Sequence, residues 1–196
     1  LKRKKPTVYS IWNDLFHEDV PFDFIDKAMG IIALCPQHIF IALTKRPKRM
    51  HNYFDYTTDN RGHAIEQAVL DLTDGEACFL HGTEPLENLW LGVTAENQEQ
   101  ADNRIPYLLN TPAAKRIVSL EPLLGSINLN LCHECQAEPW KCHAHNKIDW
   151  VICGGETGKN ARPVMEDYVY DLQMQCEEAN VPFYFKSWGE WFPRKA

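Results

Sequence analysis

The fold is decided by an apolar run that ends in a polar loop, Leu89-Trp90-Leu91-Gly92-Val93-Thr94-Ala95-Glu96-Asn97. Its first five residues predict a short strand, and a helical pattern follows from about Gln98 to Leu109. The stretch therefore predicts one strand-then-helix unit, with polar side chains placed just after the strand.

The same unit recurs along the chain. Further strands are predicted at residues 7–12, 38–43, 115–120, 150–153 and 182–185, and further helices at 21–34, after 47 and near 166–180. Six apolar strands, most of them separated by a helix, predict an α/β fold with a parallel sheet and right-handed crossovers. The pattern fits either a doubly wound open sheet or a partial or closed parallel (β/α) barrel. We favour the barrel.

Length and composition indicate one folded domain, residues 1–196. Turn-rich residues 55–88 predict one insertion, and residues 130–147 predict a second, small insertion rich in Cys and His. The net charge of −7 argues against bulk nucleic-acid binding. No apolar run approaches the roughly 18–20 residues that cross a bilayer. No signal-peptide pattern opens the chain, so we expect a cytoplasmic protein with no membrane contact.

Charged residues follow the predicted strands. Loops after the strands of a parallel barrel converge at one rim, where such folds keep their chemistry. We therefore expect four carboxylates and two ammonium groups on one functional face: Asp14, Lys45, Glu96, Glu121, Glu156 and Lys186.

A glycine-rich turn after one buried strand is a candidate for cofactor binding. Gly154 and Gly155 would expose backbone N–H groups, and Glu156 would accept a hydrogen bond from an ammonium. The alternative is a tight strand-to-helix turn without a ligand.

Three further charged positions are candidate catalytic residues. Lys45, followed by Arg46, could orient a carboxylate or phosphate, or both could be solvated at a helix start. Glu121 precedes Pro122, which restricts its backbone and suits either a ligand-binding acid or an ion pair. Lys186 follows the last predicted strand.

The cysteines fall into two groups. Cys35, Cys78, Cys153 and Cys176 lie in apolar periodic segments, as buried thiols do. The other three, Cys132, Cys135 and Cys142, lie close together near His143 and His145. Three thiolates and one imidazole suit a tetrahedral structural zinc site, for which we take His145 as the fourth ligand with His143 open. Unligated thiols are the alternative.

Six motifs, taken in order, resemble a phage and bacterial family of radical-SAM-like proteins, mostly of unknown function. They lie at residues 14–17, 43–47, 91–97, 119–123, 150–158 together with 161–163, and 185–191. The resemblance spans nearly the whole chain and implies a barrel of radical-SAM type, in the host cytoplasm if the gene is phage-borne. It further implies a three-cysteine motif binding a [4Fe-4S] cluster that cleaves S-adenosylmethionine, and this chain lacks that motif.

Two functions follow from the resemblance. The first is an S-adenosylmethionine-dependent modifying enzyme, or part of one, in which Gly154, Gly155 and Glu156 meet the amino-acid end of the cofactor and the cluster belongs to a longer form. Lys45, Glu121 and Lys186 would then serve cofactor and substrate. The alternative is a degenerate, non-catalytic barrel that binds a protein partner and is stabilised by zinc.

Overall fold

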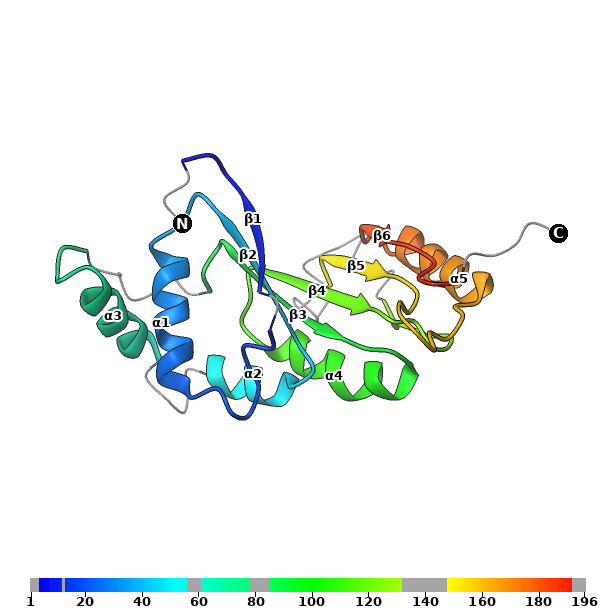
Figure 1. Ribbon diagram of the computed structural model, residues 1–196, viewed down its shortest axis with the longest axis horizontal. Helices are drawn as coiled ribbons and strands as arrows, with labels where there is room; N and C mark the ends of the chain where they lie inside the picture. The colour runs from blue at the N-terminus through cyan, green and yellow to red at the C-terminus, as the bar shows by residue number, and fades with distance from the viewer. Residues whose placement is uncertain (1–3, 12, 56–60, 78–84, 132–147, 192–196) are drawn as a thin grey trace, which may run out of the picture. The chain divides into compact units, whose positions relative to one another are not determined.

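The computed structural model describes residues 4–11, 13–55, 61–77, 85–131 and 148–191. The elements along the chain are β1 (Val8–Ile11), α1 (Phe22–Ala33), β2 (Ile39–Thr44), α2 (Pro47–Phe54), α3 (Arg61–Leu72), β3 (Leu89–Thr94), α4 (Gln98–Asn110), β4 (Lys115–Leu120), β5 (Trp150–Cys153), α5 (Glu166–Glu178) and β6 (Phe183–Phe185) (Figure 1). The predicted strands and helices are confirmed to within about two residues at each end.

The strands follow one another in the sheet in the order β1-β2-β3-β4-β5-β6. The β1–β2, β4–β5 and β5–β6 pairs are parallel. A doubly wound sheet reverses its strand order at a switch point, whereas a (β/α) barrel adds each strand beside the previous one. The sequential order therefore matches the barrel-type topology, and the α/β prediction with a parallel sheet is confirmed.

The chain divides into two compact units. Unit 1 comprises Leu1–Gly92 and Asn110–Lys115, and unit 2 comprises Val93–Leu109 and Arg116–Ala196. The residues of β3 are shared between them. The candidate residues fall in both units: Asp14 and Lys45 belong to unit 1, and Glu96, Glu121, Glu156 and Lys186 belong to unit 2.

Unit 1 is built on the β1–β2 pair, in which Val8 lies opposite Ile39. Helix α1 begins after Pro21, which suits a helix start, and buries Ile25, Met29 and Ile32. Helix α3 lies beside α1 (Figure 1). The two helices approach closely because Gly30 has no side chain: a Cβ there would lie 3.4 Å from the side chains of Val69 and Leu72.

A buried carboxylate links the helices of unit 1. Asp26 on α1 is 6% exposed. It accepts a hydrogen bond from the Tyr53 hydroxyl of α2 at 2.8 Å and one from Arg61 of α3 at 3.4 Å. Burial raises the pKa of Asp26, and the two donors oppose that rise. Hydrogen bonds from Tyr53 and Arg61 therefore stabilise the Asp26 carboxyl group in its buried position among the helices.

Unit 2 is built on β4, β5 and β6, with Val118 opposite Val151 and Val151 opposite Phe183. Helix α5 lies beside β6 (Figure 1). It buries Val169, Leu172 and Cys176, which share one helix face because of their spacing. The apolar sides of sheet and helix form the core of this unit.

The structure describes much of the first predicted insertion and only the beginning of the second. Residues 55–88 contain α3, which packs on α1. Residues 132–147 lie outside the described part of the chain, and with them the predicted zinc ligands Cys132, Cys135, Cys142 and His145. Cys35, Cys153 and Cys176 are buried free thiols, as predicted, and Cys78 is outside the described residues.

Candidate functional site

In unit 1, Asp14 binds the end of β2. Its carboxylate accepts hydrogen bonds from the Thr44 hydroxyl at 2.6 Å, the Lys45 backbone N–H at 3.1 Å and the Phe16 backbone N–H at 3.1 Å. Arg46 completes the set with a contact of 3.0 Å. The carboxylate thus fixes the turn that carries Lys45, and its own oxygens are well supplied with donors.

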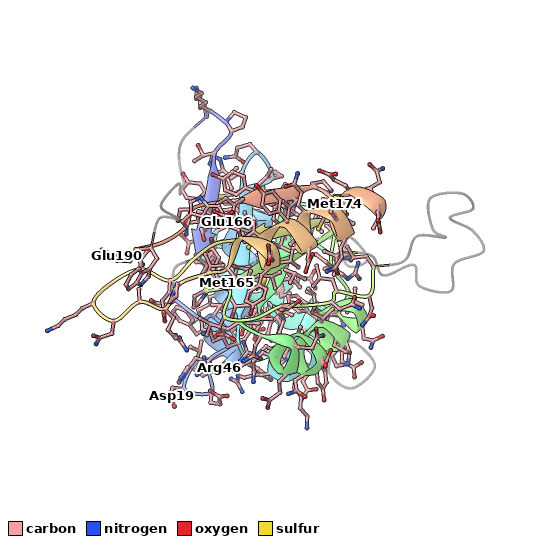
Figure 2. The ribbon with its side chains drawn as sticks, turned by 90° about the vertical axis from the view of Figure 1, so that its right-hand side faces the viewer. Asp19, Arg46, Met165, Glu166, Met174 and Glu190 are labelled. Carbon is pink, nitrogen blue, oxygen red and sulfur yellow. The ribbon has the colours of Figure 1, made fainter. Side chains whose placement is uncertain are left out.

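Arg46 extends this cluster toward the acidic loop after β1. Its Nε donates to Glu18 at 3.2 Å, and its hydrogen bond to Asp14 raises its pKa. His17 lies 3.5 Å from Asp19 in the same loop. Asp19 and Arg46 are both visible at this end of unit 1 in Figure 2. Arg46 is thus an ion-pair partner of two acids, and Lys45 extends from the same turn into solvent.

In unit 2, Glu121 and Lys186 come together. Lys186 Nζ lies 3.3 Å from Glu121 Oε2, although the two residues are far apart in the sequence. The side chain of Glu121 is 24% exposed and that of Lys186 is 61% exposed. The Glu121–Pro122 peptide bond is cis. Two of the predicted catalytic residues therefore form one charged pair at the ends of β4 and β6.

The second oxygen of Glu121 is bonded less completely. Glu121 Oε1 is buried and accepts no hydrogen bond from the part of the chain that the structure describes. It lies against Gly154, where a Cβ would come within 2.7 Å of it. A buried carboxylate oxygen without a donor is unfavourable by itself, so it marks a position where a ligand donor would be stabilising.

The backbones after β5 and β6 touch each other. Lys186 N–H donates to the Cys153 carbonyl at 2.8 Å and Gly155 N–H to the Ser187 carbonyl at 2.9 Å, which continues the ladder beyond both strands. A Cβ at Gly155 would overlap the Trp188 carbonyl oxygen. Gly189 has a φ of +73° and lies against the Glu156 carbonyl. The predicted glycine-rich turn therefore serves close backbone packing.

Glu156 is bound by Arg162. Arg162 donates to its carboxylate from the backbone N–H at 2.8 Å, from Nε at 2.8 Å and from the terminal guanidinium nitrogen at 2.7 Å. These hydrogen bonds lower the pKa of Glu156 to about 2. The carboxylate is ionised at neutral pH, and a side chain of this protein occupies its acceptor positions.

The last described residues close the same loop. Glu190 accepts from the Gly158 backbone N–H at 3.2 Å, and its own N–H donates to the Glu156 carbonyl at 2.8 Å. The Trp191 indole donates to the Ala161 carbonyl at 2.6 Å while its ring stays exposed. Residues 156–162 and 187–191 thus hold each other in place.

Glu96, the remaining predicted acid of the rim, is paired with Arg104 of α4 at 3.1 Å. Arg104 also donates to the Thr94 carbonyl at 2.6 Å. The Glu96 carbonyl accepts from Leu124 N–H at 2.8 Å, which ties the loop after β3 to the loop after β4. Glu96 therefore has a structural role in the described loops.

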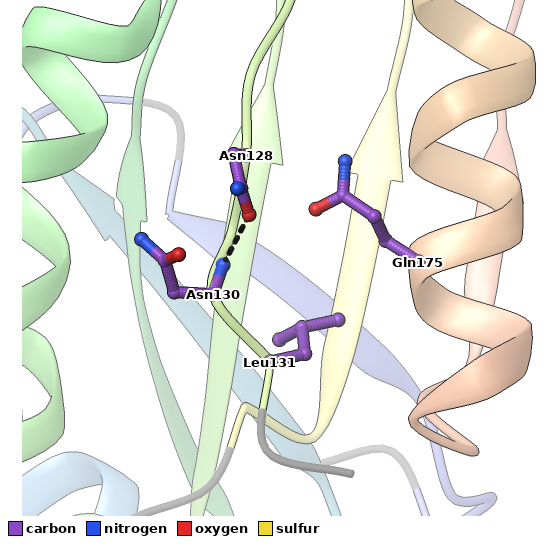
Figure 3. A pocket seen from close by; sticks show the side chains of 4 residues that line it. All are labelled: Asn128, Asn130, Leu131 and Gln175. Carbon is purple, nitrogen blue, oxygen red and sulfur yellow. Dashed lines mark hydrogen bonds between the residues drawn. The ribbon is translucent and has the colours of Figure 1, made fainter.

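A small pocket lies at the end of the described segment after β4. Its lining residues are Asn128, Asn130, Leu131 and Gln175 (Figure 3). The chain here is held by two glutamine side chains: Gln98 binds Asn128 N–H at 2.7 Å, and Gln175 binds Leu129 N–H at 2.8 Å. The same amides also donate to backbone carbonyls of this segment, at 3.1 and 2.9 Å. They bond the backbone of an extended segment as a neighbouring strand would.

Within residues 4–11, 13–55, 61–77, 85–131 and 148–191, no group of three or more His, Cys, Asp and Glu side chains could hold a metal ion. The zinc site at Cys132, Cys135, Cys142 and His145 stays a prediction. None of the described helices has the length and apolar character needed to cross a bilayer.

Comparison with protein-family models shows to which family the chain belongs. A family model described as "Protein of unknown function (DUF5131)" matches residues 1–196. The chain belongs to the DUF5131 family. No curated protein and no solved structure gives a significant match to this DUF5131 protein. The family description carries no activity, so the function must be argued from the residues.

Sequence reasoning found some contacts of this DUF5131 protein and missed others. It selected Glu121 and Lys186, which the structure brings together, and Gly154 and Gly155, which lie against Glu121 and Trp188. It missed the pairing of Glu156 with Arg162, because a bond across six residues in a loop follows no helix or strand period. The roles of Gln98 and Gln175 depend on long-range folding and carry no sequence signal.

Proposed function

We propose that this DUF5131 protein is a radical-SAM-like, S-adenosylmethionine-dependent modifying enzyme, or part of one. In this proposal, unit 2 binds the amino-acid end of the cofactor against the Glu121–Lys186 pair, with contacts to both side chains. The observation that carries it is the buried Glu121 Oε1, which has no donor among the described residues and belongs to a carboxylate 3.3 Å from the Lys186 ammonium.

The chemistry of the pair suits a zwitterion. An α-amino acid presents an ammonium and a carboxylate together, and the pair presents the complementary charges. Lys186 Nζ carries three N–H donors, so it can contact both Glu121 and a ligand carboxylate. Rotation about the last torsion of Glu121 exchanges its two oxygens, which lets either of them meet the ligand ammonium.

The proposal assigns the ammonium to Glu121 and keeps Glu156 as a second, resemblance-based candidate. Glu156 is occupied by three donors of Arg162, and a ligand ammonium would have to displace them. Gly154 and Gly155 contribute by leaving space for the Glu121 carboxylate and for the neighbouring backbone. Lys45 belongs to unit 1 and is proposed as a substrate contact.

The described residues offer contacts for S-adenosylmethionine but not for a [4Fe-4S] cluster. When bound, S-adenosylmethionine supplies a sulfonium whose carbon–sulfur bonds are reactive. The resemblance favours a nucleic-acid or protein component as the substrate. A [4Fe-4S] cluster finds no set of ligands among the described residues, so we derive no step through it.

Binding experiments test the proposal. We expect S-adenosylmethionine to bind the wild-type protein in calorimetric titrations, and Glu121→Gln to weaken binding about tenfold or more, because loss of one buried charge contact costs about 1.5–3 kcal/mol. Methylthioadenosine lacks the amino-acid end, so its affinity should be the same for wild type and Glu121→Gln. Glu166→Gln on the exposed side of α5 is the matched control.

Two outcomes would contradict the proposal. One is equal affinity of wild type and Glu121→Gln for S-adenosylmethionine. The other is equal weakening of S-adenosylmethionine and methylthioadenosine, which would mean that Glu121 supports the fold of the site without contacting the amino-acid end. Parallel measurements on Glu156→Ala separate the two candidate acceptors.

The second candidate function is a non-catalytic module that binds a protein partner and is stabilised by zinc. The observation in its favour is that Arg162 fills the acceptor positions of Glu156, as expected of a turn retained for structure. Failure of the protein to bind S-adenosylmethionine or any related nucleoside would favour it.

A further inference from the structure

Helix α5 carries an apolar stripe on the side that faces away from the core of unit 2. Tyr170 is 60% exposed and Met174 is 53% exposed. The two residues are four apart and therefore lie on one face of the helix. Val169, Leu172 and Cys176 fill the opposite face, so the exposed stripe is not needed for packing within unit 2.

Acidic side chains border this stripe on both sides. At 100° per residue, Glu166 and Glu177 fall on one side of it and Asp167, Asp171 and Glu178 on the other. All five are exposed, and the helix contains no Lys or Arg. Figure 2 labels Glu166 and Met174 on α5 and Met165 just before it, and Met165 is itself 53% exposed.

These charges favour the helix only at its N-terminus, where Glu166 and Asp167 lie in the first turn. Glu177 and Glu178 lie in the last turn, where the helix dipole favours cations, and α5 itself carries no Lys or Arg in that turn. Asp167 and Asp171 are four apart, a spacing at which like charges repel. Negative charge gathered on both sides of an exposed apolar stripe, and present even at the C-terminal end where the helix dipole disfavours it, points to a positively charged partner.

We propose that the outer face of α5 is a docking surface for a basic protein segment that presents apolar side chains between Lys or Arg residues. Charge complementarity determines the kind of partner. The stripe would fill the apolar centre of the interface, and the acids would form its charged rim. The same acids repel phosphate groups, so neither a nucleic acid nor an anionic lipid surface suits this face. None of Lys45, Glu121, Glu156 and Lys186 lies on α5, so this surface is additional to the proposed cofactor site.

Synthetic peptides provide the probe. One is a 14-residue Leu/Lys peptide with helical periodicity, and the other replaces each Leu by Ala at the same charge. We expect the Leu/Lys peptide to bind the full chain in fluorescence anisotropy at about physiological salt and to shift amide NMR signals of α5. The doubly substituted Tyr170→Ala/Met174→Ala protein should bind it about tenfold more weakly, since buried aromatic anchors dominate such interfaces.

Controls separate a specific surface from general attraction to an acidic protein. Tyr184→Ala removes an exposed tyrosine of β6 and should leave the affinity unchanged. Asp167→Asn/Asp171→Asn should weaken binding and flatten its salt dependence. The proposal is overturned if the Leu/Lys peptide does not bind, if the Ala/Lys peptide binds equally well, or if Tyr170→Ala/Met174→Ala leaves the affinity unchanged.

Discussion

Glu121 and Glu156 both follow strands of unit 2, yet their carboxylates are in opposite states. Glu156 accepts three hydrogen bonds from Arg162, whereas Glu121 has one oxygen facing Lys186 and one buried oxygen without a described donor. The sequence predicted both as site residues and had no means to separate them. Their separation depends on where Arg162 and Lys186 fold, and it makes Glu121 the better candidate for ligand binding.

The Glu156–Arg162 pair should make stability depend on pH in the acid range. The pKa of Glu156 is lowered from 4.5 to about 2 in the folded protein, so the ionised form stabilises the fold. This contribution is fully present above pH 4.5 and is lost as the pH falls toward about 2. In Arg162→Gln the pKa should return toward 4.5, and the drop in urea-unfolding free energy between pH 6 and pH 3 should shrink.

An NMR titration of the Glu156 carboxylate measures the same effect directly. Wild-type and Arg162→Gln proteins with the same midpoint would contradict the pairing. Glu190→Gln, which removes a different carboxylate charge from the same loop, is the control and should leave the Glu156 midpoint low.

The two buried thiols of unit 2 should be inert. Burial, together with the negative charge of Glu121, raises the pKa of Cys153 to about 12, and burial raises that of Cys176 to about 11. At pH 8 the reactive thiolate is then roughly 10⁻⁴ to 10⁻³ of each group. We expect iodoacetamide to modify both only after unfolding, as followed by peptide mass spectrometry. Rapid alkylation of Cys153 in the native protein would contradict its buried position.

At the scale of elements, the loops after β5 and β6 depend on glycine for their contact. Gly155→Ala would push a methyl group into the Trp188 carbonyl, and a shift of the backbone would be needed to relieve it. We expect a loss of about 1–3 kcal/mol in unfolding free energy, the range found for overpacked positions. Gly125→Ala is the matched control, because nothing lies within 4 Å of its added methyl group. Equal stability of both variants in urea would show that the two loops can separate freely.

At the scale of the whole molecule, local sequence patterns predict the strands and helices but not the side-chain contacts between loops. Apolar periodicity predicts the strands and helices because burial imposes that period on the sequence, as in β4 and α5. The side-chain bonds that hold the loops, such as Gln98 to Asn128 and Arg104 to Glu96, join residues with no common period. For the same reason the candidate rim was predicted as a set of charges, while the partner of each charge was not.

Metal content tests the zinc prediction for residues 132–147. We expect anaerobically purified protein from its native gene to contain about one zinc per chain if Cys132, Cys135, Cys142 and His145 bind zinc. Loss of that zinc in Cys135→Ser would assign it to this segment. Iron with acid-labile sulfide would instead support the radical-enzyme function. A protein that contains neither zinc nor iron would contradict both the zinc prediction and the cluster prediction.

The sequential strand order has a consequence for how the protein is made. In unit 1, β2 pairs with the strand made just before it, and in unit 2 each of β5 and β6 does the same. No strand in these pairs has to wait for a distant part of the chain, so pairing can keep pace with emergence from the ribosome. The order of synthesis and the order of assembly can therefore coincide, which limits the time that an unpaired strand edge is open to aggregation.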